Sequence, residues 1–142
     1  MIRLLTIAAL ALGPALPALA ADTAEGETLA HSPRAMPVFN LTLPRAVKAL
    51  LERYPAETLK PGDVLITNDP WLGTGHLHDI SMVSPSFLGD ELIGFFACTA
   101  HVVDVGGRGF GADGKSVYEE GIQIPIMKFA ERGVVNSVLI QL

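Results

Sequence analysis

Residues 68–80 concentrate side chains that can bind a metal ion or carry a proton. The stretch contains two imidazoles and two carboxylates, of which His76 and Asp79 stand three positions apart in a turn opened by glycines. A second polar group follows further along the chain and begins at His101. Two imidazoles and one carboxylate can hold a divalent ion such as manganese, iron or zinc while leaving coordination positions open. Open positions allow the ion to activate a water molecule or to polarise a substrate oxygen.

A β-hairpin is the element that must bring these two polar groups together. Residues 80–87 and 92–100 are typical of strands, and residues 88–91 between them predict a tight turn. Counted outward from this turn, Asp79 and His101 lie at the far ends of the two strands. Antiparallel pairing is therefore expected to place their side chains side by side.

His76, Asp79 and His101 are thus the predicted metal ligands. His78 and Asp104 are the reserve candidates for a catalytic role, as groups that hold a ligand imidazole in its binding tautomer. The competing interpretation is structural, because histidines at strand ends often only hydrogen bond to the backbone. A His-x-x-Asp spacing is also common by chance, so the spacing alone leaves both interpretations open.

Other side chains near these ligands are expected to be structural. Asn68 and Asp69 precede a proline and predict the cap of a turn. Trp71, the single tryptophan, is predicted to pack against neighbouring side chains rather than to contact a substrate. Cys98, the single cysteine, lies in an apolar run and is expected to be a small buried side chain rather than a nucleophile.

One clear helix is predicted at residues 42–54. Thr42 can serve as its N-cap, Pro44 suits the first turn because it has no amide hydrogen to leave unpaired, and Pro55 ends it. Apolar residues at helical spacing give this segment one buried face. Together with the strands, the pattern predicts an α+β fold with a mixed, mainly antiparallel sheet and this one main helix.

Four smaller features complete the expected fold. Residues 64–67 predict a buried strand that leads into the polar loop, and Pro85 predicts a sheet edge or a bulge. Residues 105–114 contain five glycines and predict a flexible loop that could close over a ligand. Asn136 is the expected N-cap of a final helix.

Size and composition limit the possible functions. The 142 residues are enough for one domain, and 49% of them are hydrophobic, so a core can form. The net charge of −5 argues against nucleic acid as a partner, because phosphate binding needs a basic patch. A single cysteine excludes an internal disulfide and fits a reducing compartment.

The first 20 residues are similar to a secretory signal or are an aberrant N-terminal segment, and residues 21–142 form the expected domain. Arg3 gives a positive start, an apolar run follows, and Ala18-Leu19-Ala20 is typical of a cleavage site. The apolar run is too short, and too interrupted by prolines, to span a membrane. The alternative is an apolar first segment that the protein retains.

A longer motif resembles a known family. Gly62-Asp63-Val64-Leu65-Ile66-Thr67-Asn68-Asp69-Pro70-Trp71-Leu72-Gly73, followed by His76-Leu77-His78-Asp79-Ile80, is similar to the signature of the hydantoinase B/oxoprolinase family. The likeness continues through Ala100-His101-Val102-Val103-Asp104-Val105-Gly106-Gly107 and Glu119-Glu120-Gly121-Ile122-Gln123-Ile124-Pro125. It extends over residues 25–142. Members of that family are several times longer, so the chain is expected to be an N-terminal fragment of the usual domain.

The resemblance implies a metal site and an ATP-linked reaction. The family's acetone carboxylase alpha subunit holds manganese through two histidines and an aspartate, which map onto His76, Asp79 and His101. Manganese is therefore the expected ion, with zinc and iron as alternatives. The family opens cyclic amides such as 5-oxoproline or hydantoins, and ATP is used by a partner subunit or domain of the hydantoinase A type.

Three matters stay open at the level of the sequence. The reaction could be cyclic amide hydrolysis or an acetone carboxylase-like carboxylation, or the chain could be a truncated, non-catalytic product. The resemblance implies a hetero-oligomer that acts on a small molecule, without membrane or nucleic acid partners. It also implies a cytoplasmic location, whereas a genuine signal in residues 1–20 would mean export.

Overall fold

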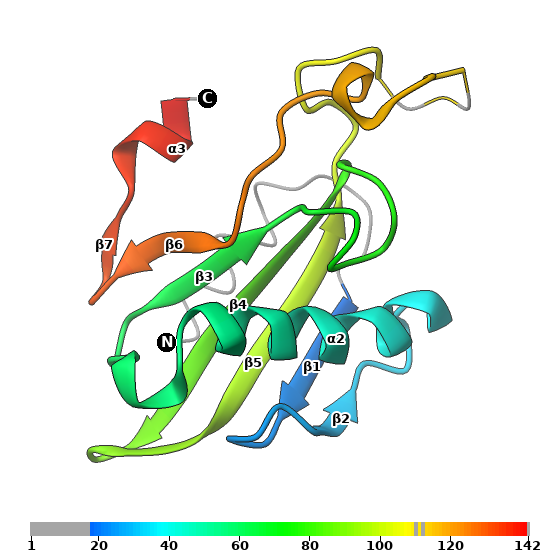
Figure 1. The fold of residues 1–142 in the computed structure, drawn as a ribbon. Coiled ribbons are helices and arrows are strands. Elements are labelled where there is room, and N and C mark those ends of the chain that lie inside the picture. Colours follow the sequence, from blue (N-terminus) through cyan, green and yellow to red (C-terminus); the bar gives the residue numbers. More distant parts are fainter. Residues whose placement is uncertain (1–17, 110, 112, 142) are drawn as a thin grey trace.

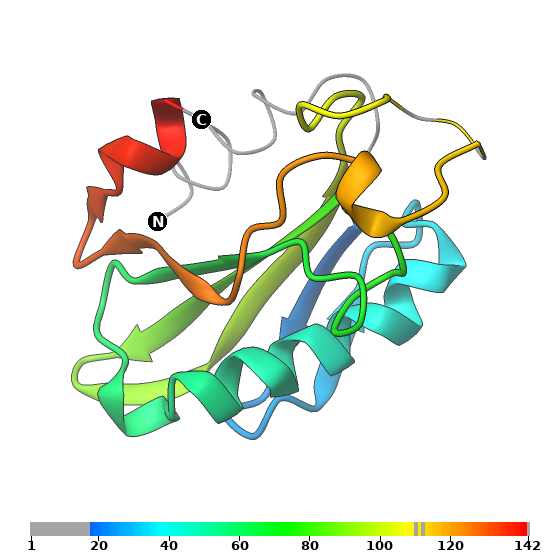
Figure 2. The ribbon, with the colours of Figure 1, turned by 45° about the horizontal axis from the view of Figure 1, so that its top comes forward.

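The computed structural model describes residues 18–109, 111 and 113–141. They form one seven-stranded sheet with a long helix lying across one face (Figure 1 and Figure 2). The strand order is β2-β1-β5-β4-β3-β6-β7, and the pairings between these strands are all antiparallel. The strands are β1 (Ala18–Asp22), β2 (Thr28–His31), β3 (Val64–Thr67), β4 (Asp79–Leu88), β5 (Glu91–His101), β6 (Met127–Glu131) and β7 (Val134–Val135). The helices are α2 (Pro37–Arg53), α3 (Ser137–Gln141) and two short 3-10 turns, η1 (Ala56–Thr58) and η2 (Val117–Glu119).

The predicted α+β class is confirmed, with one correction to the sheet. A mixed sheet would contain at least one parallel pair, and the described strands contain none. The predicted strand at residues 64–67 is β3, and the predicted hairpin is the pair β4 and β5.

The main helix begins earlier than predicted. α2 starts at Pro37 with Met36 as its N-cap, so the prediction of Thr42 as the N-cap was wrong. Thr42 lies inside the helix, where its hydroxyl donates a hydrogen bond to the carbonyl oxygen of Val38 (3.2 Å). Proline is favoured in the first helical turn, and Pro37 satisfies that preference five positions before Thr42. Pro44 is then accommodated in the helix interior.

The hydrophobic core lies between α2 and the sheet. Leu43, Val47 and Leu50 line the buried face of the helix and are at most 1% exposed. They belong to one cluster with Val83 of β4 and Phe95 of β5. Burial of each such side chain contributes about 1.5–3 kcal/mol, so this packing fixes the β4–β5 hairpin against the helix.

β1 lies inside the sheet, between β2 and β5. The expected cleavage site at residues 18–20 falls within this strand, where Ala20 is buried and pairs with Ala97. Residues 1–17, which carry the rest of the signal-like pattern, lie outside the described part of the chain. A boundary between residues 20 and 21 would therefore cut through a strand, and the fate of the first segment stays a prediction.

Two irregular positions shape the hairpin. Pro85 pairs with Phe95 and lies beyond Val83, the last β4 residue paired with β3, and the register shifts just after it. This matches the expected edge or bulge. Gly94 has a φ of 152°, and a Cβ atom at this position would lie 2.3 Å from the carbonyl oxygen of Asp22 in β1. β1 and β5 therefore approach each other as closely as only a glycine permits.

Two smaller predictions, on Cys98 and Asn136, are confirmed. Cys98 is a free, buried cysteine, and burial raises the pKa of its thiol to about 11, which fits a packing role. Asn136 accepts hydrogen bonds from the amides of Val138 (3.1 Å) and Leu139 (3.4 Å), as an N-cap does. In the part of the chain that the structure describes, none of the helices has the length and apolar character needed to cross a membrane.

A buried carboxylate fixes the start of β3. Asp63 accepts hydrogen bonds from the backbone amides of Arg132 (2.8 Å) and Lys60 (3.0 Å), and the ammonium of Lys128 lies 3.0 Å away. Burial acts to raise the pKa of Asp63, but these donors together outweigh burial and hold that pKa below its ordinary value. The folded protein therefore favours the ionised carboxylate.

Asp63→Asn is expected to lower the free energy of unfolding by about 2–3 kcal/mol at neutral pH, because charge-assisted hydrogen bonds are lost. Since the folded pKa is lowered, the stabilising contribution is present above the unfolded pKa and disappears as the pH falls through the folded pKa. The stability difference between the two proteins should therefore shrink as the pH falls below the ordinary aspartate pKa of about 3.9. Urea unfolding of both proteins in neutral and acidic buffer measures it, and a difference that widens in acid would contradict the assignment.

Candidate metal centre

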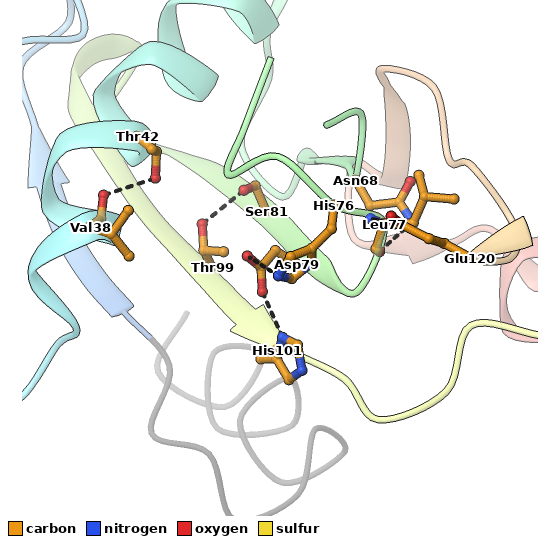
Figure 3. A network of polar contacts seen from close by, with 10 residues as sticks. All are labelled: Val38, Thr42, Asn68, His76, Leu77, Asp79, Ser81, Thr99, His101 and Glu120. Carbon is orange, nitrogen blue, oxygen red and sulfur yellow. Dashed lines mark hydrogen bonds and ion pairs between the residues drawn. The ribbon is translucent and has the colours of Figure 1, made fainter. Parts of the chain in front are cut away.

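The three predicted ligands meet at the open end of the β4–β5 hairpin (Figure 3). Asp79 and His101 are directly opposed in the register, as the hairpin count predicts. The Nδ1 atom of His101 lies 2.9 Å from Asp79 Oδ1, and the Nε2 atom of His76 lies 3.5 Å from Asp79 Oδ2. The carboxylate thus lies between the two imidazoles, with one oxygen toward each.

The donor atoms have the spacing of a metal-binding group. One ligand atom from each of His76, Asp79 and His101 lies within 4.8 Å of the other two. The Asp79 side chain is 4% exposed, whereas those of His76 and His101 are 34% and 29% exposed. A buried carboxylate flanked by two half-buried imidazoles is a nitrogen and oxygen donor set that fits a divalent transition ion with an open side.

His78 packs against both ligand histidines. Its ring is stacked on that of His101 with centroids 5.8 Å apart, and it meets the ring of His76 edge-on at 5.7 Å. The residue is 2% exposed, and its carbonyl oxygen accepts a hydrogen bond from the amide of Val102 (2.8 Å). The structure therefore brings His78 to the cluster, and its orienting role stays a prediction.

Asp104 is placed differently. It is exposed, and its Oδ1 atom accepts a hydrogen bond from the amide of Gly106 (2.8 Å). This bond is typical of a carboxylate that closes a turn within its own segment. The orienting role of Asp104 stays a prediction.

A pair of hydroxyls lies next to the cluster on the same sheet face. Ser81 and Thr99 are opposed in the register, are at most 3% exposed and hydrogen bond to each other at 2.8 Å. Ser81 lies two positions after Asp79, and Thr99 two positions before His101, so strand alternation places each on the same face as its ligand. That alternation was a signal from which the sequence analysis could have found them.

The loop before the ligands is closed by Asp69, as expected. Its side chain accepts a hydrogen bond from the amide of Trp71 (2.9 Å), and its carbonyl oxygen accepts one from the amide of Gly73 (3.0 Å). The prediction that Trp71 packs was wrong, because its side chain is 68% exposed. Its carbonyl oxygen instead accepts a hydrogen bond from Arg45 (2.6 Å), which ties the loop to α2.

Two side chains hold the backbone of Leu77: Glu120, which the sequence analysis missed, and Asn68, which was expected only to cap a turn. The amide of Leu77 donates to Glu120 Oε2 (2.8 Å), and the carbonyl oxygen of Leu77 accepts from the side chain of Asn68 (2.8 Å). Leu77 itself stands between His76 and His78. Glu120 is 43 positions from Leu77, so no local pattern could indicate this contact.

The start of the glycine-rich stretch, at residues 106–108, makes backbone contacts with a later segment of the chain. Gly106 pairs with Gly121 in an isolated antiparallel bridge, and the amide of Arg108 donates to the carbonyl oxygen of Glu119 (2.9 Å). A Cβ atom on Gly107 would lie 2.3 Å from the backbone of Glu120. The described part of this stretch is therefore held against residues 119–122.

This chain was compared with known protein families and with individual known proteins. The family model for Hydantoinase B/oxoprolinase matches residues 18–142. The 5-oxoprolinase PfmaA of Pestalotiopsis fici is 36% identical over 112 residues, which are 77% of this chain and 9% of that protein. Caprolactamase subunit beta of Pseudomonas jessenii is 34% identical over 91 residues, which are 58% of this chain and 16% of that subunit.

Two solved structures share the fold. The crystal structure of ATP-dependent caprolactamase from Pseudomonas jessenii has a TM-score of 0.77 and 26% identity, and covers 88% of this chain and 22% of that chain. A nucleotide-free structure of acetone carboxylase has a TM-score of 0.75 and 23% identity over 88% of this chain and 17% of that one, and shows the fold alone. The chain spans only 9% of PfmaA and 22% of the caprolactamase chain.

Proposed function

Because the chain belongs to the hydantoinase B/oxoprolinase family, we propose that it is the metal-binding part of a hydrolase that opens a cyclic amide with the help of ATP. The observation that carries the proposal is the convergence of His76, Asp79 and His101 within 4.8 Å. The substrate class follows from relatives named 5-oxoprolinase and caprolactamase, both of which act on lactams by name. We therefore propose 5-oxoproline or a hydantoin as the substrate.

In this proposal, each residue of the cluster has a defined task. His76 and His101 supply one imidazole nitrogen each, and Asp79 supplies a carboxylate oxygen. A divalent ion held there would supply Lewis acidity toward an amide carbonyl or a water molecule. Burial of Asp79 keeps its carboxylate away from competing water, and the partial exposure of the two imidazoles leaves a side open to a small molecule.

We propose manganese as the ion, on the basis of the family resemblance and the mixed nitrogen and oxygen donor set. Imidazole and carboxylate ligands also suit iron and zinc, and such sites generally bind manganese more weakly than zinc. The ion found in the protein therefore depends on metal availability as well as on the ligands. Reconstitution with each metal separately is needed to compare them.

A partner subunit is expected to handle ATP. One relative is named as a subunit beta, which implies at least one other subunit in that protein. Residues 109–116 match the letters of a phosphate loop, but a three-residue 3-10 turn (η2) follows them instead of the helix that binds phosphate in such loops. We propose that a hydantoinase A-type subunit or domain phosphorylates the substrate and that this chain contributes the metal site.

The test is metal content. The purified full chain, reconstituted with Mn²⁺ and desalted, is expected to retain about one ion per chain when measured by plasma mass spectrometry. Retention would separate the metal-site proposal from the alternative of a non-catalytic product. A folded chain that retains no Mn²⁺, Zn²⁺ or Fe²⁺ would contradict it. If the ion is retained, release of glutamate from 5-oxoproline by the chain, ATP and an A-type subunit tests the reaction.

A further inference from the structure

Leu77 has both of its main-chain polar groups held by side chains from other segments. Its amide donates to Glu120 Oε2 and its carbonyl oxygen accepts from Asn68 Nδ2, each at 2.8 Å (Figure 3). Leu77 is 1% exposed and stands directly between His76 and His78. A loop residue whose amide and carbonyl are both fixed cannot rotate either peptide plane without breaking a hydrogen bond. The backbone that carries His76 is therefore held on its C-terminal side.

Asn68 also forms hydrogen bonds with a second segment of the chain, at residues 122–124. The same Nδ2 group also donates to the carbonyl oxygen of Ile122 (2.9 Å), and its Oδ1 atom accepts from the amide of Ile124 (2.5 Å). Its own backbone amide donates to the carbonyl oxygen of Ile124 (3.2 Å). Asn68 is 2% exposed, so these bonds form away from bulk water. One side chain thus joins the end of β3, the ligand loop and residues 122–124.

Glu120 is itself fixed by the segment that follows His101. Gly107 lies so close to the Glu120 backbone that a Cβ atom would come within 2.3 Å of it, and the neighbouring Gly121 pairs with Gly106. The chain between His101 and Gly107 is short. The position of the Glu120 carboxylate is therefore linked through backbone contacts to the strand end that presents His101.

We propose that Asn68 and Glu120 are positioning residues that hold His76 within reach of Asp79 and His101 before an ion binds. This inference rests on the metal site proposed above and adds two residues to it. Neither residue contacts the ion; both act through the backbone of Leu77. Outer partners of this kind typically change metal affinity by about 10–100-fold, because ligands that are already ordered lose less entropy on binding.

The main test compares three variants of the full chain. Glu120→Ala removes the acceptor for the Leu77 amide and is expected to weaken Mn²⁺ binding by about 10–100-fold in a titration followed by electron paramagnetic resonance. Glu120→Gln keeps an acceptor oxygen of the same reach and should bind within about 3-fold of the wild type. Asp63→Asn is the matched control, because it breaks a comparable set of backbone hydrogen bonds at the other end of β3. It should lower stability and leave Mn²⁺ affinity unchanged.

A second readout needs no metal. In the metal-free protein, the Leu77 amide should be protected from hydrogen exchange in the wild type and in Glu120→Gln, and should exchange about 10-fold faster in Glu120→Ala. Equal Mn²⁺ affinity in wild type and Glu120→Ala would overturn the proposal. If the wild type binds no metal, the proposed function fails. In that case, unchanged hydrogen exchange at the Leu77 amide in Glu120→Ala would separately show that Glu120 does not fix the Leu77 backbone.

Discussion

Replacing His101 with alanine is expected to reduce Mn²⁺ affinity by more than about 100-fold, so that the desalted protein contains no stoichiometric ion. The change removes one of three donors, and the remaining His76 and Asp79 are too few to hold a divalent ion against dilution. His76→Ala should have the same effect on metal content by removing the other imidazole. Plasma mass spectrometry after desalting, together with a Mn²⁺ titration, measures the loss.

The two substitutions should differ in their effect on stability. His101→Ala removes the 2.9 Å partner of the buried Asp79 carboxylate, whereas His76→Ala leaves that pair in place. Loss of a buried hydrogen-bond partner costs about 1–3 kcal/mol, so His101→Ala should unfold at lower urea concentration. Circular dichroism must confirm that each variant is folded before its metal content is interpreted.

His31→Ala is the matched control for both variants. It removes an imidazole from β2, where the residue is exposed and its ring contacts the backbone of Ser32. Its metal content should equal that of the wild type. A His101→Ala protein that binds one ion as tightly as the wild type would show that the cluster is not the metal site.

Gly94→Ala is expected to be the most destabilising of the single substitutions considered, at about 3 kcal/mol or more. Gly94 has a φ of 152°, which a residue with a side chain rarely adopts. The added Cβ would lie 2.3 Å from the carbonyl oxygen of Asp22. The opposing atom belongs to the backbone of β1 and cannot rotate away. β1 would have to separate from β5 in the middle of the sheet.

Gly89→Ala separates the effect of backbone conformation from that of the close approach. Gly89 lies in the turn of the same hairpin with a φ of 63°, and an added Cβ would meet nothing within 4 Å. This substitution should cost only about 1–2 kcal/mol. Urea unfolding of the two variants and the wild type measures the difference. Equal losses would mean that the contact with Asp22 does not limit the packing of β1.

The hairpin and its ligand pair were predictable because two simple rules apply to them. Side chains alternate along a strand, and antiparallel register is counted from the turn, so Asp79 had to oppose His101. The strand at residues 64–67 was predictable for a similar reason, since a short run of apolar residues between turn signals has few alternatives. These features depend only on neighbours along the chain or across one turn.

The remaining features depend on contacts that the sequence does not indicate locally. Capping preferences and Pro44 favoured a helix start at Thr42, whereas the helix begins at Pro37. Trp71 was assigned to packing on the basis of residue type and is exposed instead. Glu120 reaches Leu77 across 43 positions, so its contribution could be found only in three dimensions.

The position of Asp79 and His101 at the open end of the hairpin has a consequence for how the gene can vary. Gly89 and Asp90 form the tip at the opposite end of the hairpin. An insertion there leaves Asp79 paired with His101. A single-codon insertion or deletion within either strand would instead turn the ligand to the other sheet face, unless a bulge absorbs it. Epitope tags or fluorescent reporters are therefore best introduced at the tip, and natural length variation should be concentrated there.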